Sequence, residues 1–223
     1  MSLDFDSARL PNKNLTPEHH EWRAQLRRFI DREIMPYAED WDESGSIPQE
    51  LWPKAAEVGL LGMGYPEEFG GVTAGIDLWH GIIVNEEMAR VAVGGVAATL
   101  LVHGIGLPPV INFGSDAIKQ MVAPPVLAGT KRISLAITEP GGGSDVAQLQ
   151  TTARLDGDHY VVNGSKTYIT GGMNANWFTT AVRTGGEGSG GVSTLLIPAD
   201  AEGVSRTALD RKQGWWCSDT ATI

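Results

Sequence analysis

A glycine-rich segment in the second half of the chain places the tightest constraint on its fold. Residues 133–138 form a short apolar run of strand length, and Pro140, which cannot donate a hydrogen bond to a neighbouring strand, follows it. Three consecutive glycines, Gly141 to Gly143, and the hydroxyl of Ser144 come next. Because such a loop leaves backbone N–H groups uncovered by side chains, it can direct several donors toward one anion, as phosphate-binding nests do.

A second β-rich arm follows at residues 151–172. Asp-Gly at 156–157 predicts the turn of one hairpin, and Asn-Gly at 163–164 predicts a type I′ turn between two further strands. Strand alternation would place Tyr168 and Thr170 on one face, where an aromatic ring and a hydroxyl could serve a flat polar ring. Taken alone, both arms also suit an ordinary glycine-rich turn and hairpin, because short glycine-rich matches are weak evidence for a binding site.

The two arms read T-E-P-G-G-G-S-D and, further along, N-G-S-K-T-Y-I-T, and together they resemble the acyl-CoA dehydrogenase family of flavoproteins. In that family the first motif and the later I-T strand hold FAD in a small β-barrel domain. The resemblance implies that the first arm lines the flavin and its phosphates and that the second flanks the isoalloxazine ring. The FAD-binding residues that it implies are Leu135, Ile137, Thr138, Gly143, Ser144, Tyr168, Ile169 and Thr170.

Four positions within the motifs bear on the comparison with the family. Tyr168 stands where many relatives have Trp, and Gly142 stands where Ala is common, so an aromatic ring and a small residue are kept. Ser144 has two open interpretations: it binds a flavin phosphate, or it contacts the CoA side of the substrate. Glu139 lies inside the loop motif, where we expect a structural, hydrogen-bonding role.

The first half of the chain shows helical periodicity. Helix-start signals stand at Thr16 and Asp77, and the expected helical stretches are 16–36, 48–59, 77–88, 94–113 and 115–125, with 42–46 as a loop. The apolar stretch 94–113 suits a buried helix or the wall of an acyl cavity. Glu86 and Glu87 belong to a stretch similar to the family's E-E-x-A-R motif, but we expect solvated charges there, since Glu is seldom buried.

A change in pattern near Lys131 marks the expected domain boundary. The expected strands are 133–138, 151–155, 159–163, 165–170, 177–184 and 192–197, and several short strands with turn signals indicate a barrel or sandwich. The predicted fold class is α+β: an N-terminal all-α domain over 1–131, followed by a small β-barrel, flavin-binding domain over 132–223. Because Ile223 ends a β-rich pattern with an uncovered strand edge, we expect the sequence to be a fragment of a longer protein.

Composition excludes several classes of function. The chain has 223 residues and a formal net charge of −10, which is enough for one or two domains and argues against nucleic-acid binding. No apolar run approaches a membrane span, and the N-terminus lacks a secretory signal, so we expect a cytoplasmic, bacterial location. One cysteine excludes an internal disulfide. The histidines show no metal-ligand spacing, so no metal site is predicted.

The resemblance also implies a reaction. It is the α,β-dehydrogenation of an acyl-CoA thioester to the trans-2-enoyl-CoA, as in fatty acid β-oxidation, with hydride passing to FAD and electrons then to an electron-transfer flavoprotein. The catalytic base is expected beyond Ile223, and a homo-oligomer, tetramer or dimer, is expected. The alternatives are an acyl-CoA oxidase or flavin monooxygenase on the same fold, or a non-catalytic fragment.

Overall fold

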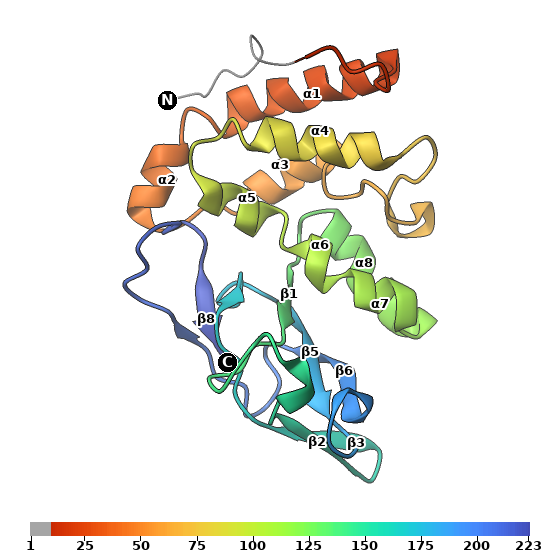
Figure 1. Ribbon diagram of the computed structural model, residues 1–223, viewed down its shortest axis with the longest axis vertical. Helices are drawn as coiled ribbons and strands as arrows, with labels where there is room; N and C mark the ends of the chain where they lie inside the picture. Colours follow the sequence, from red (N-terminus) through yellow and green to blue (C-terminus); the bar gives the residue numbers. More distant parts are fainter. Residues whose placement is uncertain (1–9) are drawn as a thin grey trace. The chain divides into compact units, whose positions relative to one another are not determined.

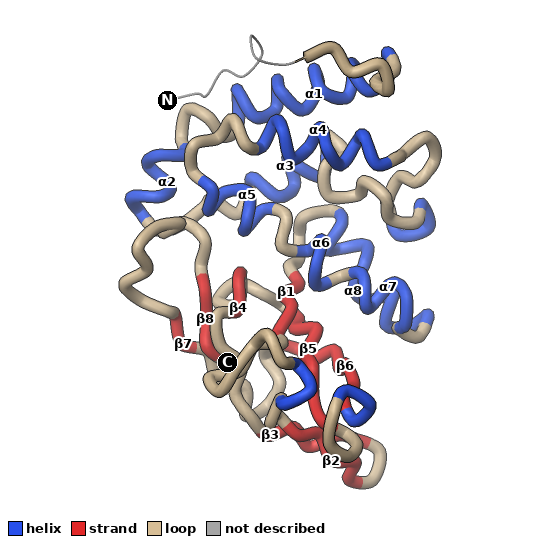
Figure 2. The backbone as a smooth tube through the Cα atoms, in the orientation of Figure 1, coloured by secondary structure: helices blue, strands red, loops and turns tan. Residues whose placement is uncertain are grey.

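The computed structural model describes residues 10–223, which divide into two compact units (Figures 1 and 2). Of the described residues, the first unit contains 10–101 together with 124–130 and 213–218. The second contains residues 102–123, 131–212 and 219–223. The first unit is helical and the second carries all the strands, so a helical part followed by a β-rich part is confirmed. The domain boundary expected near residue 131 remains a prediction.

The helices of the first unit surround one apolar core. The elements are α1 (Pro17–Glu33), α2 (Ala38–Ser44), α3 (Leu51–Glu57), the 3-10 turn η2 (Glu67–Phe69), α4 (Leu78–Met88) and α5 (Gly94–Leu100). The core draws on all five of these α-helices and includes Leu26 and Ile30 from α1, Ala38 from α2, Trp52 from α3, Met88 from α4 and Leu100 from α5. The apolar periodicity of α1 predicted its buried face, whereas Leu78 at the start of α4 is exposed despite its apolar side chain.

Two sheets form the second unit. Its helices are α6 (His103–Gly106), α7 (Pro108–Phe113) and most of α8 (Asp116–Leu127). Two 3-10 turns, η3 (Val146–Gln148) and η4 (Ser189–Gly191), lie in its loops. Its strands are β1 (Ile133–Ala136), β2 (Thr152–Asp156), β3 (His159–Asn163), β4 (Ile169–Thr170), β5 (Trp177–Arg183), β6 (Val192–Pro198), β7 (Thr207–Ala208) and β8 (Thr220–Thr222).

The first sheet is mixed and has the strand order β1-β5-β2-β3, with β6 also paired to β5. Strand β1 runs parallel to β5, whereas β5 and β6, like β2 and β3, are antiparallel. The second sheet is antiparallel, with the order β4-β8-β7. Among the described strands the sheets do not close on each other. The expected β-rich region is therefore confirmed, but it consists of two sheets and not of the expected barrel.

The structure confirms one predicted hairpin and corrects the other. Strands β2 and β3 pair across Asp156 and His159, and Gly157 takes the left-handed conformation of a tight turn, with φ 63°. The second hairpin, expected at 163–164, is wrong: β4 pairs with β8 instead, through Ile169 and Ala221. Local turn chemistry could not show that a strand more than fifty residues away competes for this pairing.

Two expectations about helix limits were also wrong. Residues expected as a loop after Trp41 continue α2 to Ser44, where Gly45 ends the helix with φ 73°. Helix α8 continues through Pro124 and Pro125 to Leu127 instead of breaking there. Proline lacks an N–H, but its carbonyl still accepts, and Ala128 N donates to Pro124 O at 2.9 Å, so the final turn persists.

No single helix among the described residues is long and apolar enough to cross a membrane. The bent pair formed by 94–100 and 103–113 meets the criterion by length and composition only.

Helices α1 and α4 lie side by side, and a buried ion cluster joins them (Figure 1). The Glu87 side chain is fully buried and accepts from Arg23 Nη1 at 2.9 Å and Arg27 Nε at 2.8 Å, and Arg90 Nη1 lies at 3.4 Å. Glu86 also pairs with Arg23, but its side chain keeps 39% exposure. The expectation of two solvated glutamates is therefore wrong for Glu87, because three arginines compensate its loss of water.

This cluster predicts unequal effects of two neighbouring substitutions. Glu87→Gln should lower the free energy of unfolding by about 3 kcal/mol or more, because three guanidinium groups then lose the buried carboxylate that they share. Glu86→Gln, the matched control, should cost less than about 1 kcal/mol. Urea titration of both variants provides the measurement, and equal losses would contradict the assignment.

Candidate functional site

The glycine-rich loop begins directly after β1. Glu139 and Gly142 exchange two backbone hydrogen bonds of 3.0 Å each, which closes a tight turn over Pro140 and Gly141. Beyond this turn the Ser144 side chain is exposed, and neither its hydroxyl nor the backbone N–H groups of Gly143 and Ser144 bond to other described residues. The loop therefore presents free hydrogen-bond donors at its surface.

One glycine of the loop is required by close packing. A Cβ on Gly143 would lie 3.0 Å from Cγ2 of Thr138, whereas a Cβ on Gly141 or Gly142 would meet nothing within 4 Å. None of the three takes a left-handed backbone conformation. Gly143 thus lets the loop fold back over Thr138, two residues beyond the end of β1.

Three hydrogen bonds join the glycine-rich arm to residues 166 and 167 of the second arm. Thr167 N donates to Thr138 O at 2.8 Å. The Lys166 ammonium donates to Ile137 O at 3.0 Å and to Oε1 of Glu139 at 2.8 Å. The structure therefore brings the glycine-rich loop and the segment leading into β4 together, as the resemblance implied.

Glu139 is the centre of this junction. Its buried carboxylate also accepts from Gln150 N at 2.6 Å and from Thr151 N at 2.8 Å. Burial alone would raise the pKa of Glu139, but the hydrogen bonds from Lys166, Thr151 and Gln150 outweigh it and lower the pKa from 4.5 to about 2. Glu139 is therefore a fixed anion, which agrees with the structural role expected from its place in the motif.

Tyr168 has an unusual conformation for a non-glycine residue. Its φ is 59°, and its side chain is 64% exposed, although it lies next to buried Ile169. Tyr168 falls outside β4, so the expected strand alternation with Thr170 does not apply. A left-handed, exposed aromatic residue is held against its local preference, and such strain concentrates at functional sites.

The segment around β4 has a support that the sequence did not reveal. Asp219 accepts from Met173 N at 2.7 Å through its carboxylate and from Gly171 N at 2.9 Å through its backbone carbonyl. The Thr170 hydroxyl makes no hydrogen bond to the described residues. Asp219 fixes the turn after β4, and Thr170 keeps a free polar group beside Tyr168.

The predicted site residues are distributed over both arms. Leu135 lies in β1 opposite Thr179, Ile137 and Thr138 follow this strand half-buried, and Gly143 and Ser144 lie in the exposed loop. A pocket of about 410 Å³ lies beside the loop, lined by Glu139, Pro140, Gly141, Gly142, Asp145, Gln148, Leu149, Gln150, Thr151, Gly164 and Ser165. Neither Ser144 nor the 168–170 segment lines it. Ser144 and Tyr168 are exposed, Thr170 is half-buried and Ile169 is buried.

Comparison with known proteins places this fold and loop in one family. The family model for the acyl-CoA dehydrogenase N-terminal domain matches residues 16–130, and the model for the middle domain matches residues 134–223. The chain therefore belongs to the acyl-CoA dehydrogenase family, whose members are FAD-dependent oxidoreductases.

Individual relatives agree with this assignment. A crystal structure of a putative acyl-CoA dehydrogenase from Mycobacterium smegmatis matches with TM-score 0.89 and 47% identity, covering 93% of this chain and 54% of that one. An acyl-CoA dehydrogenase from Bacillus anthracis, solved in complex with FAD, matches with TM-score 0.84 and 33% identity, covering 96% and 36%.

The mitochondrial isobutyryl-CoA dehydrogenase of Dictyostelium discoideum is 32% identical over 214 residues, 96% of this chain and 51% of the relative. The chain thus spans about half the length of such curated relatives.

The low pKa of Glu139 predicts a loss of stability in acid. Because its pKa is lower in the folded than in the unfolded protein, the stabilisation is complete above pH 4.5 and is lost as the pH falls toward 2. Glu139→Gln should reduce this acid dependence and lower stability at neutral pH, whereas exposed Asp158→Asn should leave both unchanged. Thermal melts between pH 7 and pH 3 provide the measurement, and parallel curves for wild type and Glu139→Gln would contradict the assignment.

Proposed function

We propose that this chain supplies the flavin-binding part of an FAD-dependent acyl-CoA dehydrogenase that oxidises the α,β-bond of an acyl-CoA thioester to the trans-2-enoyl-CoA. The observation that carries the proposal is the hydrogen-bonded junction between the glycine-rich loop and the Tyr168–Thr170 segment. It holds free amide donors, an exposed aromatic ring and a free hydroxyl on neighbouring parts of one unit.

These groups fit the chemistry of FAD. The open amides of Gly143 and Ser144 suit a pyrophosphate, since backbone N–H groups bind anions without adding a charged side chain. Tyr168 offers a ring for stacking, and the Thr170 hydroxyl offers a hydrogen bond to a polar ring edge. The residues proposed to hold FAD are Leu135, Ile137, Thr138, Gly143, Ser144, Tyr168, Ile169 and Thr170.

The cofactor supplies the hydride acceptor, which no amino-acid side chain can provide. The chain's own residues hold the cofactor and set its orientation: Lys166 and Glu139 fix the loop, and Gly143 keeps its surface open. Removal of the α-proton requires a carboxylate that can accept it. Glu139 and Glu87 do not suit this step, because both are already held as ions by buried cationic groups. We place the base in the part of the protein outside this sequence.

We further propose an electron-transfer flavoprotein as the acceptor of the electrons. This rests on the dehydrogenase assignment: the reduced flavin must be reoxidised, and in a dehydrogenase an acceptor other than oxygen takes the electrons. Oxygen consumption equal to product formation during turnover would contradict this choice and favour an oxidase.

The visible spectrum of the purified full-length protein tests the proposed function directly. Under anaerobic conditions we expect a flavin spectrum that bleaches when an acyl-CoA is added. A colourless protein that cannot be loaded with FAD would overturn the proposal. A flavin spectrum that none of a series of acyl-CoA thioesters bleaches would overturn the dehydrogenation while keeping the flavin site.

The Thr170 hydroxyl should contribute to flavin retention. Thr170→Ala should weaken FAD binding or slow flavin reduction by a factor that corresponds to about 1 kcal/mol, the value of one hydrogen bond. Thr170→Ser keeps the hydroxyl and is the matched control. FAD titration and stopped-flow reduction provide the measurements, and identical values for Thr170→Ala and wild type would remove Thr170 from the site.

The loop surface gives an independent prediction. Gly143→Val should abolish or strongly reduce FAD loading, because its side chain would collide with Thr138 and cover the open amides. Gly190→Val is the control, since Gly190 is exposed and a Cβ there meets nothing within 4 Å. Flavin content per chain is the measurement, and a fully loaded Gly143→Val protein would argue against the anion-binding role of the loop.

A further inference from the structure

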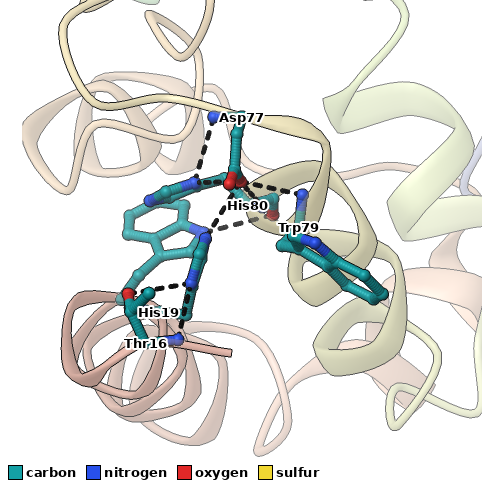
Figure 3. A network of polar contacts seen from close by, with 6 residues as sticks. Thr16, His19, Asp77, Trp79 and His80 are labelled. Carbon is teal, nitrogen blue, oxygen red and sulfur yellow. Dashed lines mark hydrogen bonds and ion pairs between the residues drawn. The ribbon is translucent and has the colours of Figure 1, made fainter. Parts of the chain in front are cut away.

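Three metal-ligating side chains converge in the first unit (Figure 3). His19 lies in the first turn of α1, Asp77 precedes α4, and His80 lies in its first turn. His19 Nε2 and His80 Nδ1 each lie 2.9 Å from Asp77 Oδ1, and the three candidate ligand atoms lie within 4.8 Å of one another. Both histidines are buried, whereas the Asp77 side chain is half exposed.

The fold assembles this cluster from positions far apart in the sequence. Thr16 caps α1 and Asp77 caps α4, and His19 and His80 occupy the matching third position of each helix. Because the two helices begin side by side, the histidine rings face each other with centroids 4.4 Å apart. Sequence spacing predicted no metal site, since residues 19 and 80 look unrelated along the chain.

One nitrogen of the cluster has conflicting neighbours. His80 Nδ1 lies 3.2 Å from the backbone N–H of Asp77, which needs an acceptor, and 2.9 Å from Asp77 Oδ1, which needs a donor. If Nδ1 carries no proton, its lone pair faces the carboxylate oxygen of Asp77, and the two repel each other. If Nδ1 is protonated, its N–H faces the backbone N–H of Asp77, and these two groups repel each other instead. A cation bound between Nδ1 and the carboxylate removes this lone-pair repulsion, at the cost of the 3.2 Å bond that Nδ1 accepts from Asp77 N.

The surroundings also suit a metal ligand set. In the structure, His19 Nδ1 accepts from the backbone N–H of Thr16 at 2.9 Å. With Nε2 on a metal the ring proton would move to Nδ1, which would then donate to Thr16 Oγ1, also at 2.9 Å, as the outer support that metal-bound histidines usually have. Asp77 uses only Oδ1 in its hydrogen bonds within the described residues, so Oδ2 can turn toward a cation. His80 also lines a surface pocket of about 280 Å³, which Glu18 and Glu21 share with the apolar residues Trp22, Met63, Val72 and Ile76.

We propose that His19, Asp77 and His80 form a binding site for one divalent transition-metal cation of the Zn²⁺ type. Two imidazoles and one carboxylate are ligands that such cations accept, and the exposed side of Asp77 leaves room for water at a fourth position. The positive ends of two helices lie close by and disfavour a cation, so the negative charge of Asp77 is essential to the site. The bound ion would clip the first turn of α1 to that of α4.

The test uses tag-free, full-length protein treated with a chelator and then titrated with Zn²⁺ in a calorimeter. We expect one ion per chain, and we expect Co²⁺ in its place to give visible absorption bands of a nitrogen- and oxygen-coordinated ion. His80→Gln and Asp77→Asn should each weaken Zn²⁺ binding at least about tenfold, the scale set by losing a supporting group of a metal site. His20→Ala is the matched control, because His20 is exposed and adjacent to His19.

The chosen variants keep the helix caps, since Asn caps a helix as well as Asp does and Gln suits the third position of a capping box. Circular dichroism verifies that both variants are folded. Failure of the wild type to bind one equivalent of Zn²⁺, or binding that His20→Ala removes and His80→Gln does not, would overturn the proposal. The Co²⁺ spectrum of the wild type tests the site without any substitution, and neither readout depends on flavin.

Discussion

The ion pair between Lys166 and Glu139 is the interaction on which the arrangement of the proposed flavin site depends. It connects the loop after β1 with the segment that leads into β4, which pairs in a different sheet. A buried pair is stable only when its remaining hydrogen-bonding capacity is filled, and here Ile137 O, Gln150 N and Thr151 N fill it. The pair therefore fixes the mutual position of the open amides and the exposed Tyr168, which neither sheet alone would determine.

The same principle governs the buried carboxylates of both units. Glu87 is surrounded by three arginines and Glu139 by a lysine and two amides, so each remains ionised in the interior. Such groups give specificity to packing but are unsuited to accept a proton at neutral pH. Asp77 differs from them, because it is half exposed and shared by two histidines, and this combination leaves one carboxylate oxygen available to a ligand.

The sequence by itself determined the class of fold and the family. Apolar periodicity and the caps at Thr16 and Asp77 located α1 and α4, and the two long motifs identified the loop and the segment around Thr170. These signals are local, because a cap or a strand-length run depends on residues a few positions apart. The motif also implied a structural role for Glu139, which its hydrogen bonds confirm.

Only the tertiary structure decided which distant groups meet. Strand β4 pairs with β8, the counter-ions of Glu87 come largely from α1, and His19 faces His80. None of these contacts can be recognised from the spacing of residues along the chain. The turn signal at 163–164 predicted the wrong hairpin, and the prolines of α8 predicted the wrong helix end, for the same reason. Long-range pairing and packing outweigh a local preference worth about 1 to 3 kcal/mol. The sequence named the parts of the site, and the fold set their geometry, because burial and long-range hydrogen bonding depend on residues that are remote along the chain.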